Sequence, residues 1–257
     1  MDHPPLLHVH KGNISLVVTR DPEEIRKAQS LRYRIFFEEI AGVTPTSHEN
    51  LDCDEYDELC DHVIVYDQNT VIGTYRFLRP EYMKTVGKYY TQSEFDLDKL
   101  LGKYSGNVVE VGRSCIDPAY RTGSIIKLLW GGITLYLETF NIDLMFGCAS
   151  FPGDDPSQHA HCLSYLHHFH RINDTLCPTP LEHVKASFEL TPKDNLDEKQ
   201  SFSSLPPLIK GYLRLGGKVG TGAVIDSHVN TTDVCIIVDK KDISQRYLDH
   251  LMASIKE

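Results

Sequence analysis

Hydrophobic and polar positions divide the first part of the chain into clear elements. Apolar residues at 13–19 predict a short strand. Asp21 and the proline after it are typical of a helix start, and the helical spacing of apolar residues predicts a helix that ends near Gly42. The polar, acidic segment 43–61 predicts a long loop, and the apolar runs within 62–79 predict a hairpin.

The middle of the chain carries a strand–helix–strand pattern. It consists of a strand at 107–116, a helix at 124–140 that Ser124 caps, and a second strand at 142–150. Short joints between these elements are typical of a βαβ unit. The pattern therefore predicts two neighbouring parallel strands with a right-handed crossover.

The other segments complete an α/β prediction. We expect one domain over residues 1–257, with an extended C-terminal region from about residue 171. Its sheet has six or seven strands, antiparallel at first and with a parallel central pair, and helices flank it. The further elements expected are helices at 93–101 and 157–170, a strand at 183–190, a polar loop at 191–204, a helix or tight turn within 205–217, a strand at 234–239 and a final helix.

Composition narrows the class of protein. The hydrophobic fraction of 41% and charged fraction of 24% are ordinary for a folded soluble domain. No apolar run is long enough to span a membrane, and the N-terminus lacks the pattern of a secretory signal. Seven cysteines at irregular spacing favour a reduced, cytoplasmic compartment, and a net charge of −10 argues against nucleic acid as a partner.

Two charges interrupt the apolar strand at 107–116. Strand alternation places Glu110 and Arg113 on opposite faces unless the strand bulges, for which Gly112 is the expected position. Buried charges in a strand need partners, so one interpretation is a structural ion pair with Arg32, Arg34 or Arg76. The other is a carboxylate that takes a proton from an amine.

Three further groups of residues have both a functional and a structural interpretation. The turn Arg121, Thr122, Gly123 and Ser124 opens a helix, where backbone N–H groups and an arginine bind phosphate, although an ordinary strand-to-helix turn looks the same. Asp54 and Asp57 are solvated loop acids or hold an ammonium group. The histidines at 159–170 lack the spacing of paired metal ligands on a helix, so we expect no metal site.

Several long segments in order resemble one family. LRYRIFFEE, DEYD, GTYRFLR and EVGRSCI resemble the acyl-homoserine-lactone synthase branch of the GNAT acyltransferases. Within that branch the segments EVGRSCIDPAYR, GCASFPGDDP, LSYLHHFH and LPPLIKGYLRLGG are similar to the L-ornithine Nα-acyltransferase family. The resemblance covers about residues 14–250 and implies a GNAT-like fold.

The resemblance also implies roles for named residues. Glu110, Arg113 and Ser114 fall at the catalytic strand positions, and Arg121, Thr122, Gly123 and Ser124 at the loop that binds the donor's phosphopantetheine arm. This loop is shorter than the usual GNAT phosphate loop, which favours a carrier protein over coenzyme A as the donor. The positions expected to bind the acceptor are Arg32, Phe36, Asp54, Asp57 and Arg76.

The function that the resemblance implies is transfer of a 3-hydroxyacyl group from acyl carrier protein to the α-amine of L-ornithine, which forms lyso-ornithine lipid. No bound cofactor is expected. Cytoplasmic location is expected, with peripheral association at the inner membrane left open. The alternatives are acylation of glycine, lysine or glutamine, a signal synthase of the acyl-homoserine-lactone type, and a membrane-active haemolysin-like protein without enzymatic activity.

Overall fold

The computed structural model describes residues 5–43 and 50–256. The predicted loop at 43–61 therefore lies partly, at 44–49, outside the described residues. The chain forms two compact units, the first from Met1–Gly87, Asn107–Asp143 and Ser244–Glu257, and the second from Lys88–Gly106 and Leu144–Ile243. The expectation of a single domain stays a prediction.

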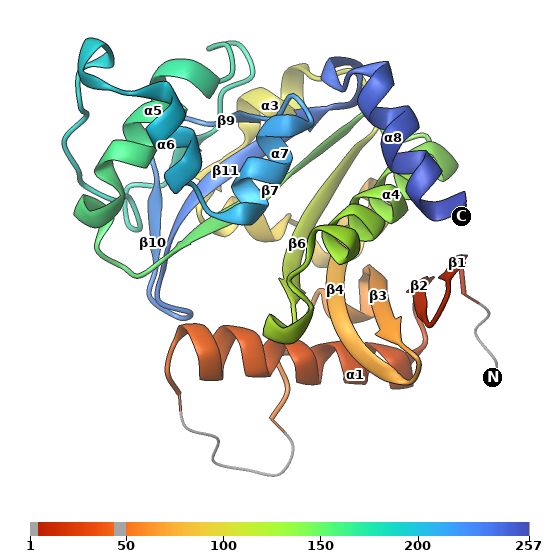
Figure 1. The fold of residues 1–257 in the computed structure, drawn as a ribbon. Coiled ribbons are helices and arrows are strands. Elements are labelled where there is room, and N and C mark those ends of the chain that lie inside the picture. Colours follow the sequence, from red (N-terminus) through yellow and green to blue (C-terminus); the bar gives the residue numbers. More distant parts are fainter. Residues whose placement is uncertain (1–4, 44–49, 257) are drawn as a thin grey trace. The chain divides into compact units, whose positions relative to one another are not determined.

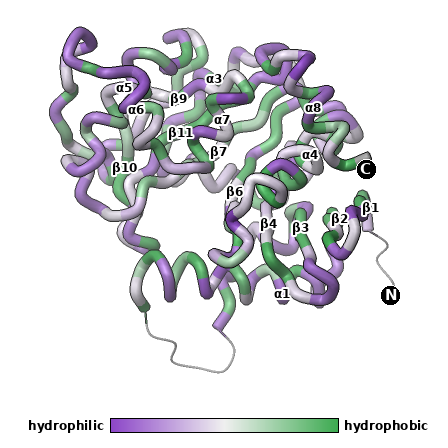
Figure 2. Tube along the Cα trace, in the orientation of Figure 1, coloured by the Kyte–Doolittle hydropathy of each residue, from purple (hydrophilic) through white to green (hydrophobic). Residues whose placement is uncertain are grey.

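The first unit is built on an antiparallel sheet in the order β1, β2, β3, β4, β6. Figure 1 shows its elements, and Figure 2 shows the hydrophobic runs along β3 and β4 that fill its core. The elements are β1 (Leu7–Lys11), β2 (Ile14–Thr19), α1 (Pro22–Tyr33), a π-helical segment (Arg34–Ile40), a 3-10 turn (Asp57–Leu59), β3 (Asp61–Asp67), β4 (Thr70–Leu78), α2 (Pro80–Val86), β6 (Val108–Ile116), a 3-10 turn (Pro118–Tyr120), α4 (Gly123–Thr139) and α8 (Gln245–Lys256).

Local sequence signals account for the start of α1. The Asp21 carboxylate accepts hydrogen bonds from the backbone N–H groups of Glu23 and Glu24, and Pro22 occupies the first helical position. Both features satisfy or remove N–H groups that have no partner within the helix. The predicted helix start is confirmed.

Helix α4 packs closely against its neighbours in the first unit. Two consecutive glycines, Gly131 and Gly132, let α8 and the Leu16 side chain of β2 approach its backbone. The buried Asp61 carboxylate on β3 also holds α4, because it accepts a hydrogen bond of 2.6 Å from the Tyr136 hydroxyl. Figure 1 shows α4 and α8 side by side.

The second unit has an antiparallel sheet in the order β7, β11, β10, and β9 also pairs with β11. A separate pair joins β5 to β8. The elements are a 3-10 turn (Tyr90–Ser93), β5 (Phe95–Asp96), α3 (Asp98–Lys103), β7 (Leu144–Pro152), a 3-10 turn (Pro156–His159), α5 (Ala160–His170), β8 (Thr179–Pro180), a 3-10 turn (Lys193–Asn195), α6 (Glu198–Ser204), α7 (Pro207–Arg214), β9 (Lys218–Val219), β10 (Val224–Asp226), β11 (Thr231–Asp239) and a 3-10 turn (Lys240–Asp242).

The α/β class and the antiparallel N-terminal strands are confirmed. The predicted hairpin, the strand at 107–116, the helix at 157–170 and the final helix are also present. The predicted parallel pair concerns β6 and β7, which belong to different units. Among the described residues, no helix is both long enough and apolar enough to cross a membrane.

Several short elements differ from the predictions. The helix expected at 93–101 begins only at Asp98, because Phe95 and Asp96 pair with Thr179–Pro180 as a strand. The segment 183–190 is not a strand, since it contacts β10 through scattered bonds such as the bridge between Lys185 and Val224. The expected loop at 191–204 contains α6, and Thr122, rather than Ser124, occupies the cap position of α4.

The close packing of α4 against α8 gives a stability prediction. A Cβ at Gly131 would lie 2.6 Å from Ile255 Cγ2 and 2.9 Å from the Leu251 carbonyl oxygen, so Gly131→Ala must displace α8. We expect the free energy of unfolding to fall by about 1–3 kcal/mol. Gly102→Ala in α3 is the control, because a Cβ at this position would have no atom of the described residues within 4 Å and alanine favours a helix. Equal urea midpoints for the two variants would contradict this packing.

Candidate active site

Arg32 lies at the base of a buried charge network in the first unit. Its side chain is 0% exposed, and it projects from the last turn of α1. Nε donates to Asp52 Oδ2 at 2.7 Å, Nη1 to Asp57 Oδ1 at 2.8 Å and Nη2 to Asp57 Oδ2 at 2.9 Å. Nη2 also donates to the Asp52 backbone carbonyl. The guanidinium therefore fastens the acidic segment after the loop to the first helix.

Asp57 receives hydrogen bonds on both of its carboxylate oxygens. Besides Arg32, its donors are Arg76 Nη1 at 2.8 Å, Gln29 Nε2 at 3.0 Å and the backbone N–H of Asp54 at 3.2 Å. Burial opposes the charged form, but the hydrogen bonds and charges of Arg32 and Arg76 hold the pKa of this carboxyl well below its usual range. Asp57 is thus a charged carboxylate, and both of its oxygens accept hydrogen bonds from within the protein.

The network continues to a more exposed edge. Arg76 on β4 donates to Asp54 at 2.6 Å, while Arg113 donates to Asp52 at 3.0 Å and to Asp54 at 3.2 Å. The exposed fraction of the side chain rises from 6% at Arg76 to 18% at Arg113 and 22% at Asp54. Arg113 and Asp54 are therefore the members of the network that a ligand from solvent reaches first.

A β-bulge in β6 brings Arg113 into this network. Gly112 pairs with Arg76 and Cys115 with Thr74, so Arg113 and Ser114 together lie opposite one residue of β4. Arg113 has a left-handed backbone with φ of +51°, which is rare for a residue with a side chain. The predicted bulge is present, but the left-handed residue is Arg113 and not Gly112.

Glu110 lies two residues before Gly112 and is buried, with 5% exposure. Burial and then the negative charge of Glu110 raise the pKa of the Tyr56 phenol to about 12. The same carboxylate contributes to raising the pKa of the buried Cys60 thiol to about 12, after burial itself. Glu110 therefore belongs to the electrostatic surroundings of the network around Asp57 and Arg76.

Phe36 and Arg34 take separate positions. Phe36 lies in the π-helical segment and packs against a hydrophobic cluster that includes Leu31, Ile35 and Ile64. Arg34 is half-exposed and pairs with Asp117 at 3.3 Å. The change from α-helix to π-helix after Tyr33 alters the relation of Phe36 to Arg32 that four-residue spacing in one helix predicts.

The predicted phosphate-binding turn lies at the start of α4. Thr122 is the cap residue, Gly123 begins the helix, and the Thr122 and Ser124 hydroxyls are 3.0 Å apart. Arg121 forms a bidentate pair with Glu39 at 2.7 and 2.8 Å. A phosphate that binds Arg121 in the same way must replace the Glu39 carboxylate.

Histidines of α5 form hydrogen bonds to other segments and within the helix. His161 is hydrogen-bonded to the Ser201 hydroxyl at 2.8 Å and His168 to the Thr191 carbonyl at 3.0 Å, and these two contacts attach α5 to other segments of the second unit. His170 is hydrogen-bonded to the Tyr165 hydroxyl of the same helix at 3.0 Å.

Comparison with known proteins decides the family. The L-ornithine N(alpha)-acyltransferase of Rhizobium meliloti (strain 1021) is 41% identical over 249 residues, which cover 93% of this chain and 84% of that protein. The protein of the same name from Brucella abortus (strain 2308) is 40% identical and is covered over 89% of its length. This chain belongs to the L-ornithine Nα-acyltransferase family. Residues 31–131 of this acyltransferase also match the acetyltransferase (GNAT) domain.

Solved structures of two other synthases share the fold of this acyltransferase. A CoA-dependent acyl-homoserine lactone synthase with MTA has a TM-score of 0.52 and 12% identity, covering 92% of this chain and 83% of that chain. An N-acyl amino acid synthase from uncultured soil microbes has a TM-score of 0.50 and 9% identity, covering 89% and 92%. The GNAT-like fold expected from the sequence is confirmed.

Asp52 is a member of the network that the sequence interpretation missed. It accepts from both Arg32 and Arg113, and it lies two residues before Asp54 in the acidic run DCDEYDELCD. The sequence signal for Asp52 is its place in that run, and the run contains several other acids that could equally well pair with an arginine. The predicted residues Arg32, Asp54, Asp57, Arg76 and Arg113 do come together in one network.

The different burial of two aspartates gives a stability prediction for this acyltransferase. Asp57→Asn leaves Arg32 and Arg76 as buried cations that have lost a charged partner, so we expect a loss of about 3–5 kcal/mol in the free energy of unfolding. Asp54→Asn at the exposed edge is the matched control and should cost about 1 kcal/mol. Guanidinium unfolding measures both, and a larger loss for Asp54→Asn would contradict the assigned order.

The buried His62 predicts a pH dependence of stability. Burial lowers the pKa of this imidazole to about 4, and the charges of Arg32 and Arg76 lower it further. The hydrogen bond of 2.9 Å from Nε2 to the Asp57 carbonyl opposes this shift in part. The unfolded chain therefore binds more protons between about pH 6.5 and 4, and stability falls as the pH drops through this range, by on the order of 3 kcal/mol.

His62→Gln removes this titration. We expect a smaller difference between its unfolding free energies at pH 7 and pH 5 than in the unchanged protein, measured by chemical denaturation. An unchanged difference would contradict the neutral, buried imidazole.

Proposed function

We propose that this acyltransferase moves a 3-hydroxyacyl group from an acyl carrier protein thioester to the α-amine of L-ornithine, forming lyso-ornithine lipid. The observation that carries the proposal is the 38–41% identity to L-ornithine N(alpha)-acyltransferases over 90% or more of the chain. The carrier protein as donor is supported by the short loop before α4, which offers one phosphate-binding turn. A cytoplasmic location, where carrier protein and free amino acid meet, fits this reaction.

The reaction needs one proton removed before the new bond forms. The α-ammonium loses a proton, the amine nitrogen attacks the thioester carbonyl carbon, and the carbon–sulfur bond of the tetrahedral intermediate then breaks. The attacking nitrogen loses a second proton, and the thiolate of the carrier arm takes up this proton as it leaves. Neither a redox change nor a bound cofactor enters this balance.

Glu110 is the base in this proposal. Its side chain is only 5% exposed and lies on β6, three residues before Arg113. The proton passes from the ammonium to the carboxylate directly or through one water molecule.

The bulge of β6 supplies the group that stabilises the oxyanion. Because Arg113 and Ser114 lie opposite a single residue of β4, the regular ladder is interrupted there. Backbone N–H groups around Ser114 donate to the developing oxyanion, an interaction worth about 3–4 kcal/mol per donor in well-studied enzymes. Arg113 contributes its positive charge at the same position.

Acceptor and donor bind at different parts of the first unit. At the exposed edge of the network, Asp54 and Arg113 contact the acceptor, while Arg32, Asp57 and Arg76 hold that edge in place and Phe36 supplies an apolar surface. The phosphate of the carrier arm binds at Arg121, Thr122, Gly123 and Ser124, where it replaces the Glu39 carboxylate.

The proposal is tested by incubating the purified chain with 3-hydroxyacyl carrier protein and a panel of amino acids. We expect N-acylornithine by mass spectrometry, with less product from glycine, lysine or glutamine. Replacing ornithine by S-adenosylmethionine tests the signal-synthase alternative. Product from S-adenosylmethionine and none from ornithine would overturn the proposed acceptor. A higher rate with acyl-CoA than with the acyl carrier protein would overturn the proposed donor.

Glu110→Gln tests the base. The amide keeps the size of the side chain but cannot accept the proton, so we expect kcat to fall at least about 100-fold at neutral pH. Thermal unfolding confirms that the variant is folded. Turnover within a few-fold of the unchanged enzyme would return Glu110 to a structural role.

A further inference from the structure

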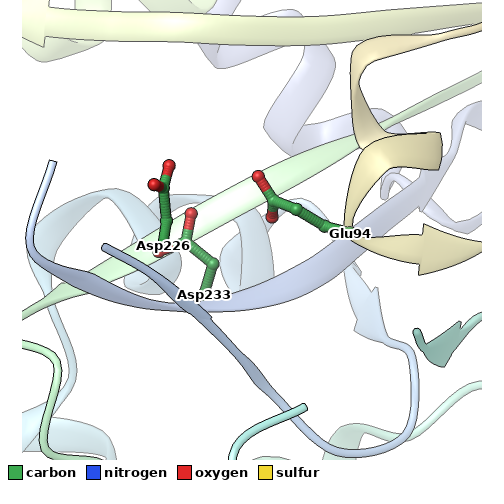
Figure 3. Close-up of side chains that lie close together, drawn as sticks. All are labelled: Glu94, Asp226 and Asp233. Carbon is green, nitrogen blue, oxygen red and sulfur yellow. The ribbon is translucent and has the colours of Figure 1, made fainter. Parts of the chain in front are cut away.

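Three carboxylates form an acidic cluster within the second unit. Glu94 follows the 3-10 turn before β5, Asp226 ends β10, and Asp233 lies on β11. One oxygen atom of each residue lies within 4.8 Å of the other two. Figure 3 shows the three side chains gathered together, with Asp233 between Asp226 and Glu94. The proposed acyl transfer uses none of them.

The acidic cluster is largely withdrawn from water. Glu94 is 6% exposed and Asp233 is 4% exposed. Carboxylates at this separation repel each other, and the repulsion is stronger in a buried setting than in water. A cation bound among the three oxygens would remove this repulsion.

A buried hydroxyl on the same face of the sheet is a second, independent sign of a ligand. Thr231 pairs directly with Asp226 and lies two residues before Asp233 on β11, so strand alternation places the three side chains on one face. Thr231 is 3% exposed, and its Oγ1 has no hydrogen-bond partner within residues 5–43 and 50–256. A buried hydroxyl without a partner is costly unless a ligand completes it.

Backbone contacts fix two of the three carboxylates in place. The N–H of Glu94 donates to the Thr91 carbonyl at 3.1 Å, and the Glu94 carbonyl accepts from the N–H of Leu181 at 2.8 Å. Asp226 Oδ1 accepts a hydrogen bond of 2.8 Å from the N–H of His228, which orients the carboxylate. Groups that are held before binding lose less conformational freedom when the ligand arrives.

We propose that the acidic cluster, together with the Thr231 hydroxyl, binds a divalent metal ion that prefers oxygen ligands. Carboxylate and hydroxyl oxygens are hard donors, and magnesium, calcium and manganese are the ions that such donors suit. The site lies entirely within the second unit. A bound ion would join β10 and β11 to the segment before β5.

Calcium fits the geometry of the acidic cluster best. A calcium ion lies about 2.3–2.6 Å from each oxygen ligand, so two of its ligands lie at most about 5 Å apart. The three carboxylate oxygens meet this limit without moving. Magnesium keeps several water ligands and uses one or two carboxylates, which a buried cluster of three does not match. We therefore expect calcium to bind more tightly than magnesium.

One side of the acidic cluster is open to solvent. Asp226 is half-buried, and Ser150, which pairs with Asp233 across β7 and β11, is exposed. An ion that enters past Asp226 exchanges water ligands for carboxylate oxygens as it reaches the buried side.

Calorimetric titration of the full chain tests the site, with calcium chloride and with magnesium chloride after EDTA treatment and removal of the chelator. We expect a single calcium ion to bind, more tightly than magnesium. Because the ion binds the folded chain, the thermal unfolding midpoint should rise by about 5–10 °C at a calcium concentration about 100 times the dissociation constant. Absence of calcium binding, or an unchanged midpoint, would overturn the proposal.

Two aspartate variants locate the bound ion. Asp226→Asn should weaken calcium binding by at least about ten-fold, because one of the charged ligands is lost. Asp174→Asn makes the same chemical change in the same unit at a side chain that is 80% exposed, and it should leave the affinity unchanged. Equal affinities in the two variants would overturn the assignment to the acidic cluster.

Thr231→Val keeps the test decisive where Asp226→Asn does not fold by circular dichroism. Valine has the shape of threonine without the hydroxyl, so we expect calcium binding to weaken by about three- to ten-fold. In the calcium-free protein the same variant should leave the unfolding midpoint unchanged or raise it, because it removes a buried polar group without a partner. A lower midpoint in the calcium-free variant would overturn the role of this hydroxyl as a ligand.

Two thiols on the same sheet face offer an alternative set of ligands. Cys148 and Cys235 pair across β7 and β11, and Cys235 lies two residues after Asp233. Thiolates favour zinc over calcium. Zinc binding that Cys148→Ser abolishes and Asp226→Asn leaves unchanged, with no binding of calcium, would overturn the oxygen site in favour of the thiols. None of these measurements depends on acyl transfer.

Discussion

The buried guanidinium of Arg32 is the constraint on which the first unit depends. A charge with no exposure to water is costly unless it is paired, and Asp52 and Asp57 supply its partners. The first helix and the acidic segment are therefore held together by charge. Arg76 and Arg113 extend the pairing onto β4 and β6, so that two strands and a helix share one set of carboxylates. The buried pairs of Arg32 therefore hold Asp54 and Arg113 in place at the exposed edge.

The bulge of β6 makes that arrangement possible. A regular strand turns Glu110 and Arg113 to opposite faces, and only one of them then meets the aspartates. The left-handed backbone at Arg113 breaks the alternation and sends its side chain to Asp52 and Asp54. The ion pairs of Arg113 stabilise this unfavourable conformation, since a strained backbone persists only where its surroundings fix it. The same irregularity interrupts the regular pairing of β6 with β4 at Ser114.

Local signals in the sequence were sufficient for the elements that obey local rules. Asp21 and Pro22 mark the start of α1, and short apolar runs mark β3, β4 and β6, because these signals depend on neighbouring residues alone. The pairs of Asp52 with Arg32 and of Glu39 with Arg121 join segments that are distant in the sequence. The sequence alone does not show which of several acids each arginine contacts. The short strand Phe95–Asp96 depends on Thr179–Pro180, and its own sequence therefore resembled the start of a helix. The site residues that were predicted came from resemblance to a family, whose motifs already carry pairings across the chain.

Two groups of acidic side chains in this chain have different effects. Asp52, Asp54 and Asp57 form ion pairs with three arginines, and these pairs fix one surface of the first unit. Glu94 and Asp233 in the second unit are buried as well, and after burial itself their charges raise the pKa of the Cys148 thiol well above its usual value. Carboxylates therefore fix a surface in one unit and keep a thiol protonated in the other, because their neighbours differ.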